Sequence, residues 1–301
     1  MRYMYRNGNY QVIIDGNTGT KIRFTSDDEF RPRFAESIDI TLTYQCDGGC
    51  PFCYADCTPQ GKHADLMSRE VSLLIDSLHP HTELALNGND LSIPHLEEFL
   101  EELKQKRIFA NLTVNQKHFV KNIDLLKEWS DEGLIKGLGV SLSDPTDKNL
   151  YRIMEFPSAV LHTVAGILSE EDIDLLKNKD IKLLILGYKQ KGRGKAYYSQ
   201  ETEDNIKTLK ELLPSMLEEH WFKLISFDNL ALEQLAIKNL LSEEEWEETY
   251  MGDDATFTFF IDFVNKTYAG NSLTETTYPI TDWNTNTMFR NIQATKKETH
   301  L

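Results

Sequence analysis

Three cysteines within eight residues set the strongest constraint on what this chain can fold into. They stand at Cys46, Cys50 and Cys53, in the spacing C-x3-C-x2-C. A run of β-branched and apolar residues, 38–43, leads directly into them, so we expect the loop to follow a strand. Three thiolates on one short loop can hold three irons of a cubane [4Fe–4S] cluster. The fourth iron is then left open to a ligand from outside the protein.

The same cysteines could instead belong to either of two other kinds of metal site. Cys57 extends the pattern to C-x3-C-x2-C-x3-C and could close the cluster with a fourth thiolate. A zinc ion would need a fourth ligand, which Cys57 or His63 could supply. Neither kind of site commonly has this spacing. We therefore expect an open cluster, with Cys57 as a free thiol near the loop.

The cysteine loop resembles that of the radical S-adenosylmethionine (radical SAM) superfamily, in which an aromatic residue precedes the last cysteine, as Phe52 does here. The resemblance covers residues 37 to about 200. It implies that SAM chelates the open iron and that one electron from the cluster splits SAM. The resulting 5′-deoxyadenosyl radical then removes a hydrogen atom from the substrate, and an external donor of the flavodoxin or ferredoxin type supplies the electron. The chain also resembles a branch with phage and gut-bacterial members, in which an N-terminal hairpin precedes this loop.

Strand and helix patterns alternate from residue 37 onward, which predicts an α/β fold. Six βα units in series imply a parallel sheet with right-handed crossovers. Six is also the count of the partial (βα)6 TIM-like barrel that the resemblance implies. The expected strands are 38–43, 83–87, 110–115, 137–143, 159–165 and 181–187. The expected helices are 68–78, 94–106, 119–130, 147–154 and 170–178.

Two further parts flank the predicted core, which spans 37–200. Residues 1–36 are expected to form an N-terminal β-hairpin and a connector, with strand-like runs in 10–24 around a turn that contains Asp15, Gly16 and Gly19. Residues 201–301 are expected to form an α+β extension that covers the barrel mouth, including a strand at 256–264. The last dozen residues are polar and are expected to be mobile.

Polar residues and glycines stand where the predicted strands end, and active sites of such barrels gather at the carboxyl ends of the strands. The turn after the second strand departs from the superfamily's usual pair of glycines followed by Glu-Pro. Each of these residues has a plain alternative role, as a polar residue or glycine that ends a strand. The resemblance implies that SAM is bound by Phe52, Asn87, Gly88, Asn89, Asn115, Ser141, Ser143 and Gly187.

A basic segment follows the sixth predicted strand and suggests where the substrate lies. Residues 189–195 hold four cations in seven positions around two glycines. Such a segment could receive a phosphate, a carboxylate or an acidic peptide, and its plain alternative is a solvated loop. We expect Tyr188, Lys189 and Arg193 to contact the substrate, which would then be anionic.

Charge and composition exclude several classes of protein. A formal net charge of −16 makes broad nucleic-acid binding unfavourable, because phosphates are neutralised by clustered Lys and Arg. No segment has the apolar length of a membrane span, and the N-terminus does not read as a signal peptide. All four cysteines lie between 46 and 57, which favours a reducing cytoplasm over a disulfide framework. An oxygen-sensitive cluster further predicts an anaerobic setting.

These features predict a single-cluster radical SAM enzyme. No cysteine follows Cys57, so an auxiliary cluster bound by the C-terminal region is not expected. The substrate could be a peptide, a nucleoside or nucleotide, or a small metabolite. Two other functions also remain open: an iron–sulfur electron carrier or sensor with a closed four-cysteine cluster, and an activase that installs a radical on a partner protein.

Overall fold

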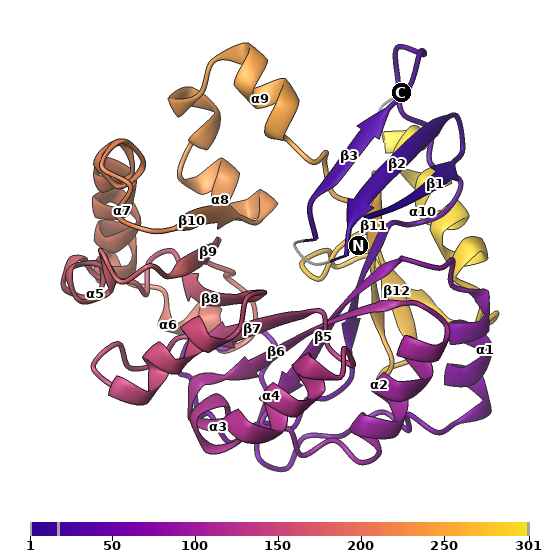
Figure 1. Cartoon of the computed structure of the whole chain (residues 1–301), viewed down its shortest axis with the longest axis horizontal. Helices are drawn as coiled ribbons and strands as arrows, with labels where there is room; N and C mark the ends of the chain where they lie inside the picture. Colours follow the sequence, from indigo (N-terminus) through magenta and orange to yellow (C-terminus); the bar gives the residue numbers. More distant parts are fainter. Residues whose placement is uncertain (1, 17–18, 300–301) are drawn as a thin grey trace.

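One large sheet organises the chain (Figure 1). The structure is a computed structural model that describes residues 2–16 and 19–299. Within these residues the sheet has ten strands in the order β10-β9-β8-β7-β6-β5-β4-β11-β12-β13. Strands β10 to β11 of this row pair in parallel, whereas β12 and β13 are antiparallel at one edge. The strands are β4 (Ser37–Thr41), β5 (Glu83–Asn89), β6 (Phe109–Asn115), β7 (Gly137–Ser141), β8 (Ala159–Val164), β9 (Lys182–Leu186), β10 (Leu224–Phe227), β11 (Thr258–Asp262), β12 (Thr267–Ala269) and β13 (Tyr278–Pro279).

The α/β fold and its six predicted core strands are confirmed. Each strand from β4 to β9 lies within two residues of its expected bounds. Strand β10 extends this row to seven, and β11 pairs in parallel with β4 on the other side. β10 and β11, at the two ends of the parallel row, do not pair with each other. The sheet is therefore an open, partial barrel.

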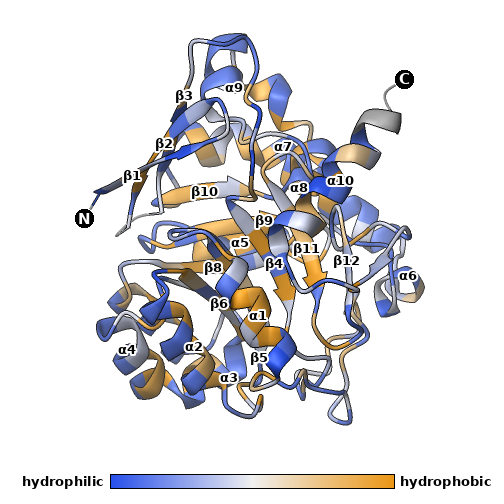
Figure 2. Ribbon diagram, turned by 90° about the vertical axis from the view of Figure 1, so that its right-hand side faces the viewer, coloured by the Kyte–Doolittle hydropathy of each residue, from blue (hydrophilic) through white to orange (hydrophobic). Residues whose placement is uncertain are grey.

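Helices follow most of the parallel strands and cover one face of the sheet (Figures 1 and 2). They are α1 (Arg69–Ser77), α2 (Leu96–Gln105), α3 (Gln116–Lys121), α4 (Ile123–Asp131), η1 (Lys148–Glu155), α5 (Glu170–Leu176), α6 (Arg193–Tyr197), α7 (Gln200–Glu218), α8 (Asn229–Gln234), η2 (Ile237–Leu240), α9 (Glu243–Thr249) and α10 (Thr285–Thr299). The predicted helix 119–130 is interrupted at Asn122, where the backbone has φ −120° and ψ 28°, between α3 and α4. The predicted helix 147–154 is the 3₁₀ helix η1.

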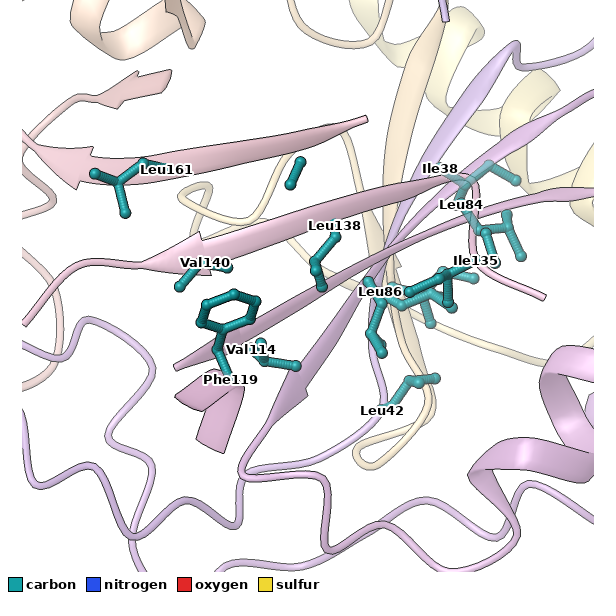
Figure 3. Packing of buried hydrophobic residues seen from close by; sticks show 14 of the residues in the cluster. Ile38, Leu42, Leu84, Leu86, Val114, Phe119, Ile135, Leu138, Val140 and Leu161 are labelled. Carbon is teal, nitrogen blue, oxygen red and sulfur yellow. The ribbon is translucent and has the colours of Figure 1, made fainter. Parts of the chain in front are cut away.

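Alternation along the strands separates the two faces of the sheet. Ile38, Leu84, Val114, Val140 and Leu161 are all fully or almost fully buried, and they point toward the helices (Figure 3). Each such side chain stabilises the fold by roughly 1.5–3 kcal/mol relative to an exposed position. Because side chains alternate along a strand, the residues between them face the opposite, inner side of the curved sheet.

A three-stranded antiparallel sheet packs at the amino ends of β4 and β5. It comprises β1 (Arg2–Asn7), β2 (Tyr10–Asp15) and β3 (Lys21–Phe24). The predicted hairpin is therefore present as β2 and β3, with β1 added, although residues 17–18 of its turn lie outside the described residues. The fully buried Glu36 joins this sheet to the barrel: it accepts a hydrogen bond from Tyr10 at 2.5 Å and pairs with Arg23 at 3.0 Å.

The C-terminal region completes the sheet on both sides. Strands β10 and β11 both come from the predicted extension 201–301, whose boundaries and role as a cover remain predictions. Of the last dozen residues, which were predicted to be mobile, 290–299 belong to α10; residues 300 and 301 lie outside the described chain. Met288, Phe289 and Ile292 of α10 are buried in the main core, which holds this helix in place.

Loops bridge the gap between β10 and β11. Asn229, directly after β10, donates to Asp254 Oδ1 at 2.6 Å and to the Gly252 carbonyl at 3.4 Å. Lys191, beyond β9, donates to the Ser272 carbonyl at 3.0 Å. The inner face is therefore enclosed on this side by side-chain contacts. Among the described residues, no helix has the length and apolar character needed to span a bilayer.

Candidate functional site

The cysteine loop leaves the carboxyl end of β4 and folds back on itself. Cys46 N donates to Thr58 O at 3.0 Å, and Thr58 N donates to Tyr44 O at 3.1 Å. Tyr44 N in turn donates to Lys62 O at 2.9 Å. Gly61 is required at this crossing, because a Cβ there would overlap the Tyr44 carbonyl. The backbone that carries the cysteines is therefore held by its own hydrogen bonds.

The three cysteines are half-buried, and two of them, Cys46 and Cys50, lie beside Gly48. A Cβ at Gly48 would lie 3.3 Å from Cys46 Sγ and 3.8 Å from Cys50 Sγ. Cys53 N donates to Cys50 O at 3.3 Å, which makes a tight turn of the last two cysteines. No three His, Cys, Asp or Glu side chains in the described chain are close enough to hold a single metal ion. Three thiolates on one short loop are a donor set that fits an iron–sulfur cluster.

Cys57 is buried and in contact with the loop. Its interaction with Cys53, together with burial, raises the pKa of Cys57, and the same interaction lowers the pKa of Cys53. Burial raises the pKa of Cys50, and the nearby charges of Cys53 and Cys46 add to the increase. His63, the other alternative ligand, instead shares a hydrogen bond of 2.9 Å between its Nδ1 and the Thr43 hydroxyl.

Two predicted SAM-binding residues, Asn87 and Asn89, hold the start of the cysteine loop. Asn87 Oδ1 accepts from Leu42 N at 2.6 Å, and its Nδ2 donates to Thr43 O at 2.7 Å. Asn89 Nδ2 donates to Gln45 O at 2.9 Å. Both amides are thus engaged with the loop backbone, so these residues position the cysteines. Whether either one also contacts SAM stays a prediction.

The two predicted cofactor-binding glycines lie where neighbouring elements approach closely. A Cβ at Gly88 would lie 2.9 Å from Leu112 Cδ1 on β6, and a Cβ at Gly187 would overlap Leu230 of α8. Gly187 N donates to Asp228 Oδ1 at 2.8 Å. Packing within the protein therefore requires both glycines, whatever ligand lies nearby.

Asn115 connects β6 to the cysteine loop. Its Oδ1 accepts from His118 N at 2.9 Å and caps α3, while its Nδ2 lies 3.5 Å from Cys46 Sγ. Asp47, next to Cys46, accepts from His118 Nε2 at 2.9 Å and from Lys117 Nζ at 2.6 Å. Asn115 is therefore a predicted site residue that the structure brings into contact with a predicted cluster ligand.

The two predicted serines at the end of β7 differ in their surroundings. Ser141 lies on the inner face, beside Asn115 on β6, and its hydroxyl makes no hydrogen bond with another described residue. Ser143 N and Asp144 N both donate to Gln116 Oε1 at 2.9 Å. The buried Gln116, which sequence reasoning missed, thus shapes this turn; its position directly after a predicted strand end was the available signal.

Arg193 holds the cysteine loop from the opposite side of the site. Its Nε donates to the Cys50 carbonyl at 3.2 Å and its Nη2 to the Cys57 carbonyl at 2.9 Å. Its backbone N–H donates to Cys53 O at 3.2 Å and to Asp56 Oδ1 at 2.7 Å. The side chain that was predicted to contact substrate is therefore bonded to the protein's own loop.

The other predicted substrate residues also have internal partners. Tyr188 is buried, and its hydroxyl donates to Gly194 O at 2.7 Å. Lys189 Nζ lies 4.3 Å from the centre of the Tyr54 ring and 3.5 Å from Ser272 Oγ.

Phe52 was predicted to lie beside SAM. It is half-buried, and its ring contacts that of Tyr197 edge-on, with 5.9 Å between the centroids.

No protein family model matches this chain, and no curated protein sequence matches it. Solved structures do match. Streptococcus suis SuiB bound to S-adenosylmethionine has a TM-score of 0.59 at 12% identity, over 92% of this chain and 84% of that chain. SuiB bound to precursor peptide SuiA gives a TM-score of 0.59 at 12% identity, over 90% and 83% of the two chains. At this identity the likeness shows a shared fold.

Proposed function

We propose, from the radical SAM fold that this chain shares with SuiB, that it is a radical SAM enzyme with a [4Fe–4S] cluster on Cys46, Cys50 and Cys53. One observation carries the proposal: these cysteines extend from the carboxyl end of a central parallel strand, where barrels of this type have their active sites. When bound, the cluster would supply an electron that splits SAM, and the 5′-deoxyadenosyl radical would remove a substrate hydrogen atom.

The chain's own residues would fix and tune this site. Asn87, Asn89 and Arg193 hold the loop backbone on two sides, which limits the positions that the thiolates can take. Asn115 directs an amide N–H at Cys46 Sγ, and hydrogen bonds to cluster sulfurs are one determinant of reduction potential. Ser141 has a free hydroxyl on the inner face, so it is best placed among the predicted residues to bond the SAM ribose.

For the substrate we favour a peptide over a nucleotide or a small metabolite. The support is that a protein of the same fold, SuiB, was solved with its precursor peptide SuiA. We further propose a reducing cytoplasm as the setting and a flavodoxin or ferredoxin as the electron donor, because an open cluster must be kept reduced and away from oxygen.

A closed four-cysteine cluster that only carries or senses electrons is the second candidate. It is favoured by one observation, the interaction of the buried Cys57 thiol with Cys53, which brings a fourth thiol to the ligand set. Under this alternative Cys57 would be a ligand, and no iron would be open to SAM.

Anaerobic reconstitution separates the two candidates. With SAM and dithionite, the wild type should form 5′-deoxyadenosine, measured by mass spectrometry. Replacing Cys46, Cys50 or Cys53 with alanine should reduce bound iron and this product to background. Cys57→Ala is the matched control and should retain both. Wild type that binds iron but forms no 5′-deoxyadenosine, or loss of the cluster in Cys57→Ala, would favour the electron carrier.

A further inference from the structure

A row of polar side chains without partners lines the inner face of the barrel. It spans β4 to β8, on the side of the sheet opposite the helices. None of these side chains makes a hydrogen bond or an ion pair with another residue of the described chain. None is fully buried either, so each has access to the space inside the barrel. The row consists of Asp39, Asn111, Thr113, Ser141 and His162.

Asp39 is the charged member of this row. Its side chain is exposed, yet burial raises its pKa to about 6. A carboxylate can be both accessible and poorly hydrated only within a concavity. The charge of Lys189 lowers the pKa of Asp39, whereas the charges of Asp254 and Asp228 raise it. Lys189 follows β9, Asp228 follows β10 and Asp254 precedes β11. The curl of the sheet therefore brings two negative charges and one positive charge toward Asp39.

No cation of the described chain forms an ion pair with Asp39. Burial lowers the pKa of His162 to about 4, so its imidazole is neutral at pH 7. It lies across Gly139, where a Cβ would overlap the ring. Lys182, at the amino end of β9, donates to the Pro157 carbonyl at 2.5 Å. The open polar face therefore presents one carboxylate among neutral groups.

Lys189 of the basic segment 189–195 acts on Asp39 without forming an ion pair with it, and the carboxylates of Asp254 and Asp228 oppose its effect. Arg193 is bonded to the cysteine loop, Lys191 to the Ser272 carbonyl, and Lys189 lies over the Tyr54 ring. Three of the four cations on which the expectation of an anionic substrate rested thus have partners within the protein.

We infer that the substrate presents a cationic group, a primary amine or a guanidinium, to Asp39 inside the barrel. This inference rests on the proposed function, because it assigns the inner face to the substrate of that reaction. A charge-assisted hydrogen bond in a poorly hydrated cavity is stronger than the same contact on an exposed surface. The neutral polar groups of Asn111, Thr113 and His162, on β6 and β8, would bond the uncharged parts of the same ligand.

Two peptides that differ by one charge test the inference. The probes are a fluorescently labelled, end-blocked pentapeptide of four alanines around a central lysine, and the same peptide with acetyl-lysine. Affinity is measured by anisotropy on the reconstituted full-length protein with SAM present. We expect the lysine peptide to bind the wild type at least about tenfold more tightly, which corresponds to one charge-assisted hydrogen bond.

Two matched variants locate the effect. Asp39→Asn should reduce the preference to less than about twofold, since it keeps the shape of the side chain and removes its charge. Asp124→Asn, an exposed aspartate on the outer helix α4, should leave the preference unchanged. Equal affinities in the wild type, no binding of either peptide at millimolar concentration, or a preference that survives in Asp39→Asn would each overturn the inference.

The same samples keep the two proposals apart. Binding is measured without turnover, whereas formation of 5′-deoxyadenosine reports the proposed reaction. A charge preference without that product would reject the reaction and keep the cation site. The product without a charge preference would reject only the substrate class.

Discussion

At the scale of single residues, the site depends on side chains that bond to backbone. Asn87 and Asn89 contact the loop from β5, and Arg193 contacts it from α6. Contacts of this kind limit how far the three thiols can move apart. Arg193 is the most informative of these residues, because its guanidinium joins two loop carbonyls that lie on either side of Cys53.

Removing this guanidinium should loosen the cysteine loop. We expect Arg193→Ala to bind roughly two- to fivefold less iron per chain after reconstitution, since each hydrogen bond to a charged group is worth about 1.5–3 kcal/mol. Iron content and the visible absorption of the cluster measure the effect, and limited proteolysis of the loop reports it without metal. Lys195→Ala, an exposed neighbour in the same segment, is the control. Equal iron and equal cleavage in the two variants would contradict this role.

At the scale of elements, the N-terminal sheet is attached through buried charges. Glu36 accepts hydrogen bonds from Arg23 and Tyr10, and Lys21 pairs with Glu83 at 2.5 Å at the start of β5. Arg23 also lies 3.9 Å above the Phe257 ring, just before β11. The attachment therefore lies at the amino ends of the strands, away from the cysteine loop.

Neutralising Glu36 should separate the sheet from the barrel. Glu36→Gln leaves Arg23 and Lys21 partly unpaired in a buried position, and breaking a buried ion pair costs about 3–5 kcal/mol. The free energy of unfolding from urea denaturation measures this loss. Glu29→Gln, at an exposed position, should change it by less than about 0.5 kcal/mol. Similar values for the two variants would show that the buried network contributes little to stability.

At the scale of the whole molecule, the curl of the sheet creates an interior that no single element contains. Asp39 on β4 is affected by charges that follow β9 and β10, at the far end of the strand row. This arrangement gives Asp39 a raised pKa. Its charged form is therefore disfavoured in the folded state, and it destabilises the protein as the pH rises from about 4 through about 6.

Asp39→Asn should thus stabilise the protein at neutral pH. We expect its Tm to exceed that of the wild type by roughly 2 °C at pH 7.5, a modest value because the side chain is accessible to solvent. The difference should shrink as the pH falls and approach zero below about pH 3, under the ordinary pKa of 3.8, where the wild-type carboxyl is protonated in both states. Asp124→Asn gives the baseline in the same thermal scans. A difference that is constant with pH, or that grows on acidification, would contradict the raised pKa.

Most strands of the barrel can be predicted from the local pattern of apolar residues in the sequence, whereas the contacts between residues of the site cannot. Strands β4 to β9 are predictable because their apolar residues alternate or run together between turn signals, as in strands that are covered on one face. The burial of α10 depends on neighbours that are distant in sequence, so the polarity of its own residues does not predict it. The basic segment 189–195 shows the same limit, because charge alone does not reveal that Arg193 faces backbone carbonyls.

The sequence by itself determined the order of the βα units and the three clustered thiols on the first loop, since both depend on residues that are close together along the chain. The tertiary structure alone decided which polar groups face the interior and which are already bonded. The physical reason is that a hydrogen bond depends on distance in space, and the curl of the sheet brings together residues separated by more than a hundred positions, such as Arg193 and Cys50. Asp39, by contrast, has no hydrogen-bond or ion-pair partner in the described chain.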